Sequence, residues 1–149
     1  MALRDSIAED LRKALKQGQA TEVATLRLLL AGVKNAEIAQ RKPADDGKVL
    51  EIVAGEVKRR KESIEAFRLG KREELAAKEE AELRVLMGYL PEQMSREEVL
   101  AVVRRAVGEV DAKGPADKGK VMSIVMPEVK GKADGREVSE MVVQILAAI

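Results

Sequence analysis

The side chains that could carry chemistry in this chain are serine, lysine, arginine and the carboxylates, because the sequence contains no histidine and no cysteine. Their absence removes thiol nucleophiles, disulfides, zinc sites built on Cys and His, and the imidazole base. Serine with lysine remains as a nucleophile and base, and Ser123 with Lys120 or Lys130 is the best such pair. Ser123 lies in an apolar helical segment, where a hydrogen bond to the backbone is the ordinary role of serine. We therefore expect no catalytic residue.

Two further patterns have simple structural explanations. Gly119-Lys120 is followed by Val121, where a phosphate-binding loop needs Ser or Thr, and it lacks the preceding glycine. The acidic pair Glu79-Glu80 is typical of the solvent-facing side of a helix. We accordingly expect no metal site and no cofactor.

The segment from Lys113 to Arg136 has a local surplus of positive charge, with six basic and three acidic residues. Its chemistry is contact with phosphate, which lysine and arginine on loops and helix ends commonly make. The equally weighted alternative is an ordinary interhelical turn with solvated lysines. The candidate nucleic-acid-binding residues are Lys118, Lys120, Lys130, Gly131, Lys132 and Arg136.

Two helices must position these residues. Val121, Met122, Ile124, Val125 and Val129 form a helical stripe before residues 130–136, which we call the basic elbow. Within this stripe a proline at 127 predicts a kink or an early stop. A glycine at 131 suits a left-handed residue after the helix. An aspartate at 134 can cap the next helix, with the glutamate at 137 completing a capping box.

The rest of the chain reads as helices separated by clear breaks. Apolar periodicity predicts helices over residues 2–17, 21–40, 46–69, 72–90 and 96–110, with two more on either side of the basic elbow. Thr21, Asp45 or Asp46, and Ser95 are the expected caps. No alternating strand pattern is present. The predicted fold is all-α, with a four-helix N-terminal subdomain over residues 1–92 and a small three-helix C-terminal subdomain over residues 93–149.

The run Lys58-Arg59-Arg60-Lys61 is a second basic feature, in the middle of the third helix. Consecutive helical residues fan around the axis, so the four side chains cannot form one flat patch. Acidic residues at helical spacing pair Glu56 with Arg60, Lys58 with Glu62 and Lys61 with Glu65. We interpret the run as a solvent-exposed face on which the charges form ion pairs. The alternative is contact with phosphate, to which Arg59 would contribute most.

Three motifs together resemble the GatB/YqeY family: Thr25-Leu26-Arg27-Leu28-Leu29, Tyr89-Leu90-Pro91-Glu92-Gln93 and the segment from Gly119 to Arg136. The resemblance covers essentially the whole chain and implies the same two-part helical fold. In the amidotransferase subunit GatB, a similar C-terminal module helps to hold the tRNA whose amino acid is amidated. Lys130, Gly131, Lys132 and Ala133 match that tail, whereas Asp134-Gly135 stands where it usually has Asn-Pro.

The resemblance implies an accessory module that binds tRNA or another structured RNA, with a family label of carbon-nitrogen ligase using glutamine as amide donor. The implied protein partner is an amidotransferase or an aminoacyl-tRNA synthetase, and the general process is translation. Two alternatives stay open. One is a helical protein-interaction module without RNA affinity, whose Met122, Met126 and Met141 serve an apolar groove. The other is an amidotransferase component active only in a complex.

Composition limits how such a protein could bind RNA. Lysine and arginine number 27 against 26 aspartates and glutamates, so any nucleic-acid footprint is local. Phe67 and Tyr89 are the only aromatic residues, too few to stack successive bases. Charged residues near the start and the lack of a long uncharged stretch predict no membrane association and a cytoplasmic location.

Overall fold

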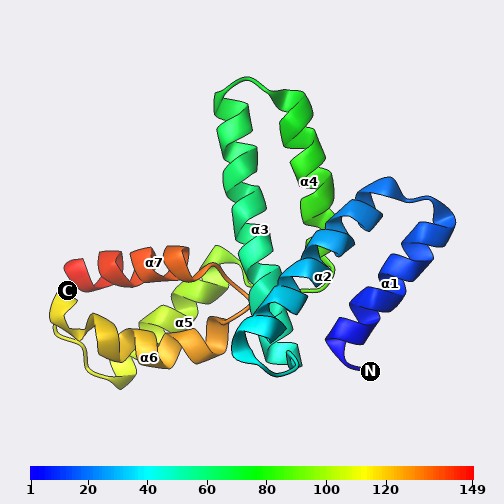
Figure 1. The fold of residues 1–149 in the computed structure, drawn as a ribbon. Helices are drawn as coiled ribbons and strands as arrows, with labels where there is room; N and C mark the ends of the chain where they lie inside the picture. Colours follow the sequence, from blue (N-terminus) through cyan, green and yellow to red (C-terminus); the bar gives the residue numbers. More distant parts are fainter. The chain divides into compact units, whose positions relative to one another are not determined.

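The computed structural model describes all 149 residues and is all-α, which confirms the predicted fold class (Figure 1). The helices are α1 (Leu3–Gln17), α2 (Ala20–Gln40), α3 (Asp46–Leu69), α4 (Glu73–Met87), α5 (Arg96–Glu109), a short 3-10 helix η1 (Pro115–Asp117), α6 (Lys118–Val129) and α7 (Gly135–Ala147). The chain forms two compact units, Met1–Leu90 and Pro91–Ile149, and each contains its own apolar core.

The first unit consists of two helical hairpins, α1 with α2 and α3 with α4. Gly18 ends α1 in the left-handed region, with a φ of 68°. Thr21 is not the cap that the sequence predicted, because α2 already begins at Ala20 and its N-cap, Gln19, makes no side-chain cap bond. The core of the unit is formed by Ile7, Leu26, Leu29, Val33, Val49, Val53, Val57 and Leu86.

The helices α2 and α3 approach each other closely at Gly32. A Cβ atom at this position would lie 3.4 Å from Cγ2 of Ile52, at the short end of ordinary van der Waals contact. Glycine in a helix interior costs about 1 kcal/mol relative to alanine. Ile52 of α3 therefore packs against Gly32, so another helix crosses α2 at this glycine.

The basic run of α3 is solvated, as the sequence predicted, at three of its four positions, and Arg60 is the exception. Arg60 is buried, with 8% of its surface exposed, and it faces three carboxylates. Its guanidinium lies 3.4 Å from Glu56 on α3, 3.3 Å from Glu82 and 4.0 Å from Glu79, the last two on α4. Lys58, Arg59 and Lys61 remain exposed. Because consecutive residues fan around a helix, one of the four had to turn inward, and its charge is matched by α4.

The end of the first unit is tied to its beginning through Tyr89. The helix α4 ends at Met87, three residues earlier than predicted, and the Tyr89 hydroxyl donates to Oδ2 of Asp10 at 2.6 Å. Burial, the hydrogen bond to Asp10 and the charge of that carboxylate raise the pKa of the Tyr89 phenol well above its usual range. Tyr89 therefore serves a structural role between α1 and the segment after α4.

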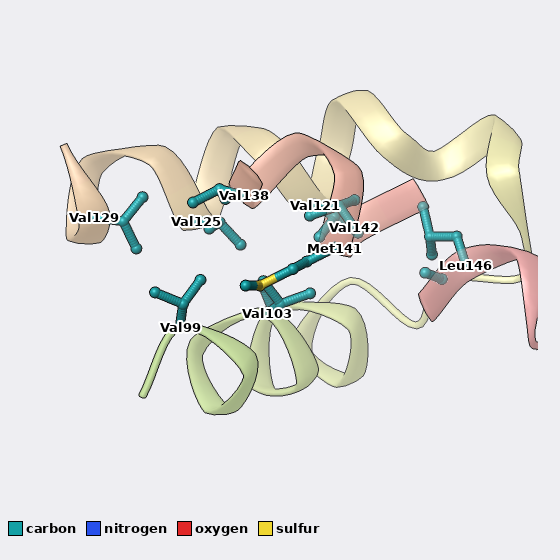
Figure 2. Close-up of a cluster of buried hydrophobic side chains, with 11 residues drawn as sticks. Val99, Val103, Val121, Val125, Val129, Val138, Met141, Val142 and Leu146 are labelled. Carbon is teal, nitrogen blue, oxygen red and sulfur yellow. The ribbon is translucent and has the colours of Figure 1, made fainter. Parts of the chain in front are cut away.

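The second unit packs three helices around a valine-rich core, and Figure 2 shows these side chains converging between α5, α6 and α7. Ser95 begins α5 with both halves of a capping box, as predicted: the Glu98 N–H donates to the Ser95 hydroxyl, and the Ser95 N–H donates to the Glu98 carboxylate. Met141 is 5% exposed and belongs to this core, and Met122 and Met126 pack against it. All three methionines therefore have a packing role in this core, Met141 as a buried member and Met122 and Met126 as partly buried neighbours.

Candidate nucleic-acid interface

The basic elbow begins with a tight turn at the end of α6. Pro127 lies in the last turn of α6, which ends two residues later at Val129, so the structure shows the early stop. The Lys132 N–H donates to the Val129 carbonyl at 2.8 Å, closing a four-residue turn. Lys130 has φ −56° and ψ 125°, and Gly131 has φ 78°, which are the angles of a type II turn. Gly131 is thus required by the turn, and the predicted left-handed conformation is confirmed.

The segment before α5 supports this turn from the side. The Met94 N–H donates to the Lys132 carbonyl at 2.8 Å, and the Gln93 side-chain amide donates to the Gly131 carbonyl at 2.9 Å and to the Pro91 carbonyl at 2.8 Å. Sequence reasoning missed this role of Gln93. The available signal was its place in the Tyr89–Gln93 motif, but no spacing rule connects residues 38 positions apart.

The other side of the elbow is the start of α7. Asp134 is its N-cap and accepts a hydrogen bond at 2.9 Å from the Arg136 N–H. The predicted capping box is not completed, because Asp134 makes the only side-chain bond of this cap. The Arg136 guanidinium points along the helix surface to Glu140, 3.5 Å away, and remains 73% exposed.

The six candidate residues form two groups instead of one. Lys118 and Lys120 lie in the first turn of α6, whereas Lys130, Gly131, Lys132 and Arg136 follow its end. Ten residues of helix separate Lys120 from Lys130, a distance of about 15 Å along the axis. Lys120 is also 3.8 Å from the carboxylate of Asp117. The structure therefore offers a main group of cations at the elbow and a second group one helix length away.

An open hollow of about 530 Å³ lies beside the elbow, and three of its four charged lining residues are acidic. Glu92, Glu98 and Glu128 line it together with Lys132. Glu128 is ion-paired with Arg105 of α5. Carboxylates repel phosphate, so an approaching nucleic acid would meet the exposed side of Lys132 and the start of α7 instead of entering the hollow.

No group in this region forms an activated nucleophile. The Ser123 hydroxyl donates to the Lys120 carbonyl at 2.7 Å, which is the backbone role that the sequence predicted for it. The structure contains no cluster of three or more side chains suited to hold a metal ion. None of the helices combines the length and the apolar character that crossing a membrane requires.

These features define a class: a helical protein of two units, in which a turn with exposed lysines joins the last two helices. A family model described as "Yqey-like protein" matches residues 4–146, and the chain belongs to this family. The family part of the resemblance noted in the sequence is thereby confirmed.

Several fungal relatives are similar over long stretches. "Altered inheritance of mitochondria protein 41, mitochondrial" of Pyrenophora tritici-repentis is 31% identical over 142 residues, covering 93% of this chain and 78% of the relative. The protein of the same name from Eremothecium gossypii is 37% identical over 93 residues, covering 60% of this chain and 51% of the relative. An uncharacterized protein of Schizosaccharomyces pombe is 32% identical over 93 residues, covering 62% of this chain and 76% of the relative.

These names correct the expected location. The sequence predicted a cytoplasmic protein, but the relatives are named as mitochondrial proteins, which points to mitochondria. The prediction was wrong because it used the absence of an apolar leader and of a membrane-spanning stretch. Those features separate membrane and secreted proteins from others, but they do not distinguish one aqueous compartment from another.

Proposed function

We propose that this protein is an accessory RNA-binding module that contacts tRNA or another structured RNA through its phosphate backbone. The observation that supports the proposal is the construction of the basic elbow. Gly131 sets a type II turn, Gln93 and Met94 hold its carbonyl groups, and Lys132 stands exposed at its end. A cation on a backbone held in this way can position a phosphate at little entropic cost.

The aromatic residues favour recognition of backbone and shape. Phe67 and Tyr89 both belong to the first unit, and Tyr89 is bonded to Asp10. The second unit therefore contains no aromatic platform on which an unpaired base could stack. A structured RNA with closely spaced phosphates is the ligand that a small group of cations can engage.

The link to amidation rests on resemblance. Residues 130–133 of the elbow resemble the tail with which GatB-type subunits help to hold tRNA, whereas Asp134-Gly135 departs from it. On that resemblance we assign this chain the binding part of a glutamine-dependent amidation of aminoacyl-tRNA. Its protein partner would be an amidotransferase or an aminoacyl-tRNA synthetase. Catalysis would belong to that partner, because Ser123 is engaged with the backbone and no other activated nucleophile is present.

The test is a triple change of Lys130, Lys132 and Arg136 to alanine, with binding to tRNA and to duplex RNA measured at several salt concentrations. Each lost phosphate contact should reduce the slope of log affinity against log salt by about 0.7 to 0.9. Affinity should fall for all RNA sequences alike, because phosphate contacts carry no sequence information.

The matched control is the triple change of Lys58, Lys61 and Lys78 to alanine, which removes the same charge from exposed positions of the first unit. It should leave the salt slope unchanged. If the elbow variant is folded and binds RNA with the affinity and salt slope of the unaltered protein, the elbow is only a turn and the proposal fails. An equal loss of RNA affinity in both triple variants would show that the effect depends on net charge alone, and it would also contradict the proposal.

A further inference from the structure

One side of α2 is exposed and almost free of charge. Leu28 and Ile38 are 58% and 66% exposed, among the largest values for apolar side chains of the chain. They lie on one helical stripe, at steps of three and four residues, and all of its members are exposed. The stripe consists of Ala24, Leu28, Ala31, Asn35 and Ile38. Together with the two cations described next, we call it the α2 outer face.

The charged residues of α2 that border this stripe are both positive. Arg27 and Lys34, seven residues apart, border the stripe on one edge, are exposed, and form no ion pair. The only carboxylates of α2 are Glu22 and Glu37. Glu22 lies nine residues from Ala31, half a turn away, and Glu37 is bound to Arg4 of α1 and to the Ala44 N–H. The α2 outer face therefore presents cations and aliphatic carbon without a compensating acid on its own helix.

This surface contrasts with other exposed surfaces of the unit. On α3, Arg59 pairs with Glu56, and between α3 and α4, Arg68 pairs with Glu80. In a chain with 36% charged residues, an exposed face with two large aliphatic side chains and only positive charge needs an explanation. Such patches commonly mark interaction sites.

We propose that the α2 outer face docks an amphipathic helix of a partner protein that carries apolar side chains flanked by carboxylates. Leu28 and Ile38 are about 15 Å apart along the helix, so a partner helix of three turns or more spans both. Ala24 and Ala31 alternate with them and let a second helix approach closely. Arg27 and Lys34 then face the partner's acidic edge, which fixes its orientation.

Other occupants fit the chemistry less well. An RNA would use the two cations but would leave Leu28 and Ile38 in contact with its charged backbone. A second copy of the chain would bring the same face, which has no carboxylate to meet Arg27 and Lys34. A membrane surface needs a broader apolar face than two aliphatic side chains provide. The inference concerns the first unit and a protein ligand, so it goes beyond the RNA contact proposed for the basic elbow.

The experiment uses a synthetic amphipathic helix of about 18 residues, long enough for five turns. Leucines form its apolar side and glutamates its edges; a matched peptide has lysine in place of every glutamate. Each is titrated into the isotopically labelled full chain, and backbone amide shifts are followed by NMR. The glutamate peptide should shift residues 24–38, and the lysine peptide should shift none of them.

Charge reversal provides the decisive variant. Arg27→Glu with Lys34→Glu should weaken binding of the glutamate peptide at least about tenfold and transfer the preference to the lysine peptide. That gain also shows that the variant is folded. Lys58→Glu with Lys61→Glu, the same charge change on exposed positions of α3, should leave the preference unaltered. Leu28→Ser with Ile38→Ser should weaken binding of the glutamate peptide to a similar extent.

The other occupants are outcomes of the same experiment. Shifts outside residues 24–38, or an unaltered peptide preference after reversal at Arg27 and Lys34, overturn the proposal. So does self-association of the protein that Leu28→Ser with Ile38→Ser abolishes, since a second copy would then occupy the face. Larger shifts of residues 24–38 with duplex RNA or with anionic lipid vesicles than with the glutamate peptide would assign the face to those ligands instead.

Discussion

The two units use the same types of charged residue in opposite ways. In the first unit, α3 and α4 turn cations inward: Arg60 meets Glu56, Glu79 and Glu82 between the helices. In the second unit, Lys132 stands exposed at the basic elbow, on a turn that the backbone and Gln93 hold by hydrogen bonds. The first arrangement makes charge part of the packing. The second leaves it available to a ligand, while the turn is maintained by other groups.

The comparison predicts that charge removal destabilises the first unit far more than the second. Arg60→Ala would leave Glu79 and Glu82 without a cationic partner between α3 and α4, and Glu56 with the exposed Arg59 alone. Removing one partner of a buried ion cluster costs about 3 to 5 kcal/mol of unfolding free energy. Denaturant unfolding measures this. The control is Arg59→Ala, whose side chain is 67% exposed and whose loss should cost less than about 1 kcal/mol.

An Arg60→Ala protein as stable as the Arg59→Ala protein would remove the contrast between the units. It would mean that Glu56, Glu79 and Glu82 relax toward water when the guanidinium is absent. The closest atom pair in the cluster lies at 3.3 Å, and the Arg60 Nε makes no hydrogen bond of good geometry. The cluster therefore acts through charge neutralisation more than through directed hydrogen bonds.

A pair of glycine substitutions should have opposite signs in the two units. Gly131→Ala places a Cβ at φ 78°, where strain costs about 1 to 2 kcal/mol, although the nearest atom, Cγ of Pro91, is 3.9 Å away. Gly55→Ala lies inside α3 with open space around it and should stabilise by about 0.5 to 1 kcal/mol. Thermal unfolding of both variants measures the difference. If both substitutions destabilise the protein, the room available for the added methyl group, and not the backbone conformation of the glycine, determines the change in stability.

Local signals in the sequence predicted much of the second unit. The Ser95 capping box, Gly131 in the left-handed region and Asp134 as a cap each depend on residues no more than three positions apart. Helix ends and turns obey such short-range rules, so the turn and the cap of the elbow could be predicted from the sequence. Its support by Gln93 could not, because that bond joins residues 38 positions apart.

In the first unit the errors came from tertiary packing. The sequence placed Arg60 on a solvated face, since Glu56 at helical spacing was a sufficient partner. The carboxylates that draw it inward, Glu79 and Glu82, belong to α4, and their alignment with α3 depends on the hairpin between the helices. Likewise the apolar residues of α2 surround the helix, so their periodicity does not show that the packing leaves Ile38 exposed.

The smallest expected effect uses the only tyrosine of the chain to follow the two units separately. Tyr89 and its acceptor Asp10 both lie in the first unit, and the second has no aromatic residue. Burial and Asp10 raise the pKa of the Tyr89 phenol, so the folded state favours the protonated form. The resulting stability is complete below the unfolded value of about pH 10 and is lost as the pH rises above it. Tyr89→Phe removes the hydrogen bond and should cost about 1 kcal/mol at neutral pH.

In an alkaline titration, phenolate absorbance reports the first unit alone, and circular dichroism reports both. If Tyr89 ionises at the same pH in the folded protein as in the denatured protein, the hydrogen bond between Tyr89 and Asp10 is absent in solution. If absorbance and circular dichroism change together at every pH, the two units unfold as one, and the difference between them lies in their surfaces and not in their stabilities.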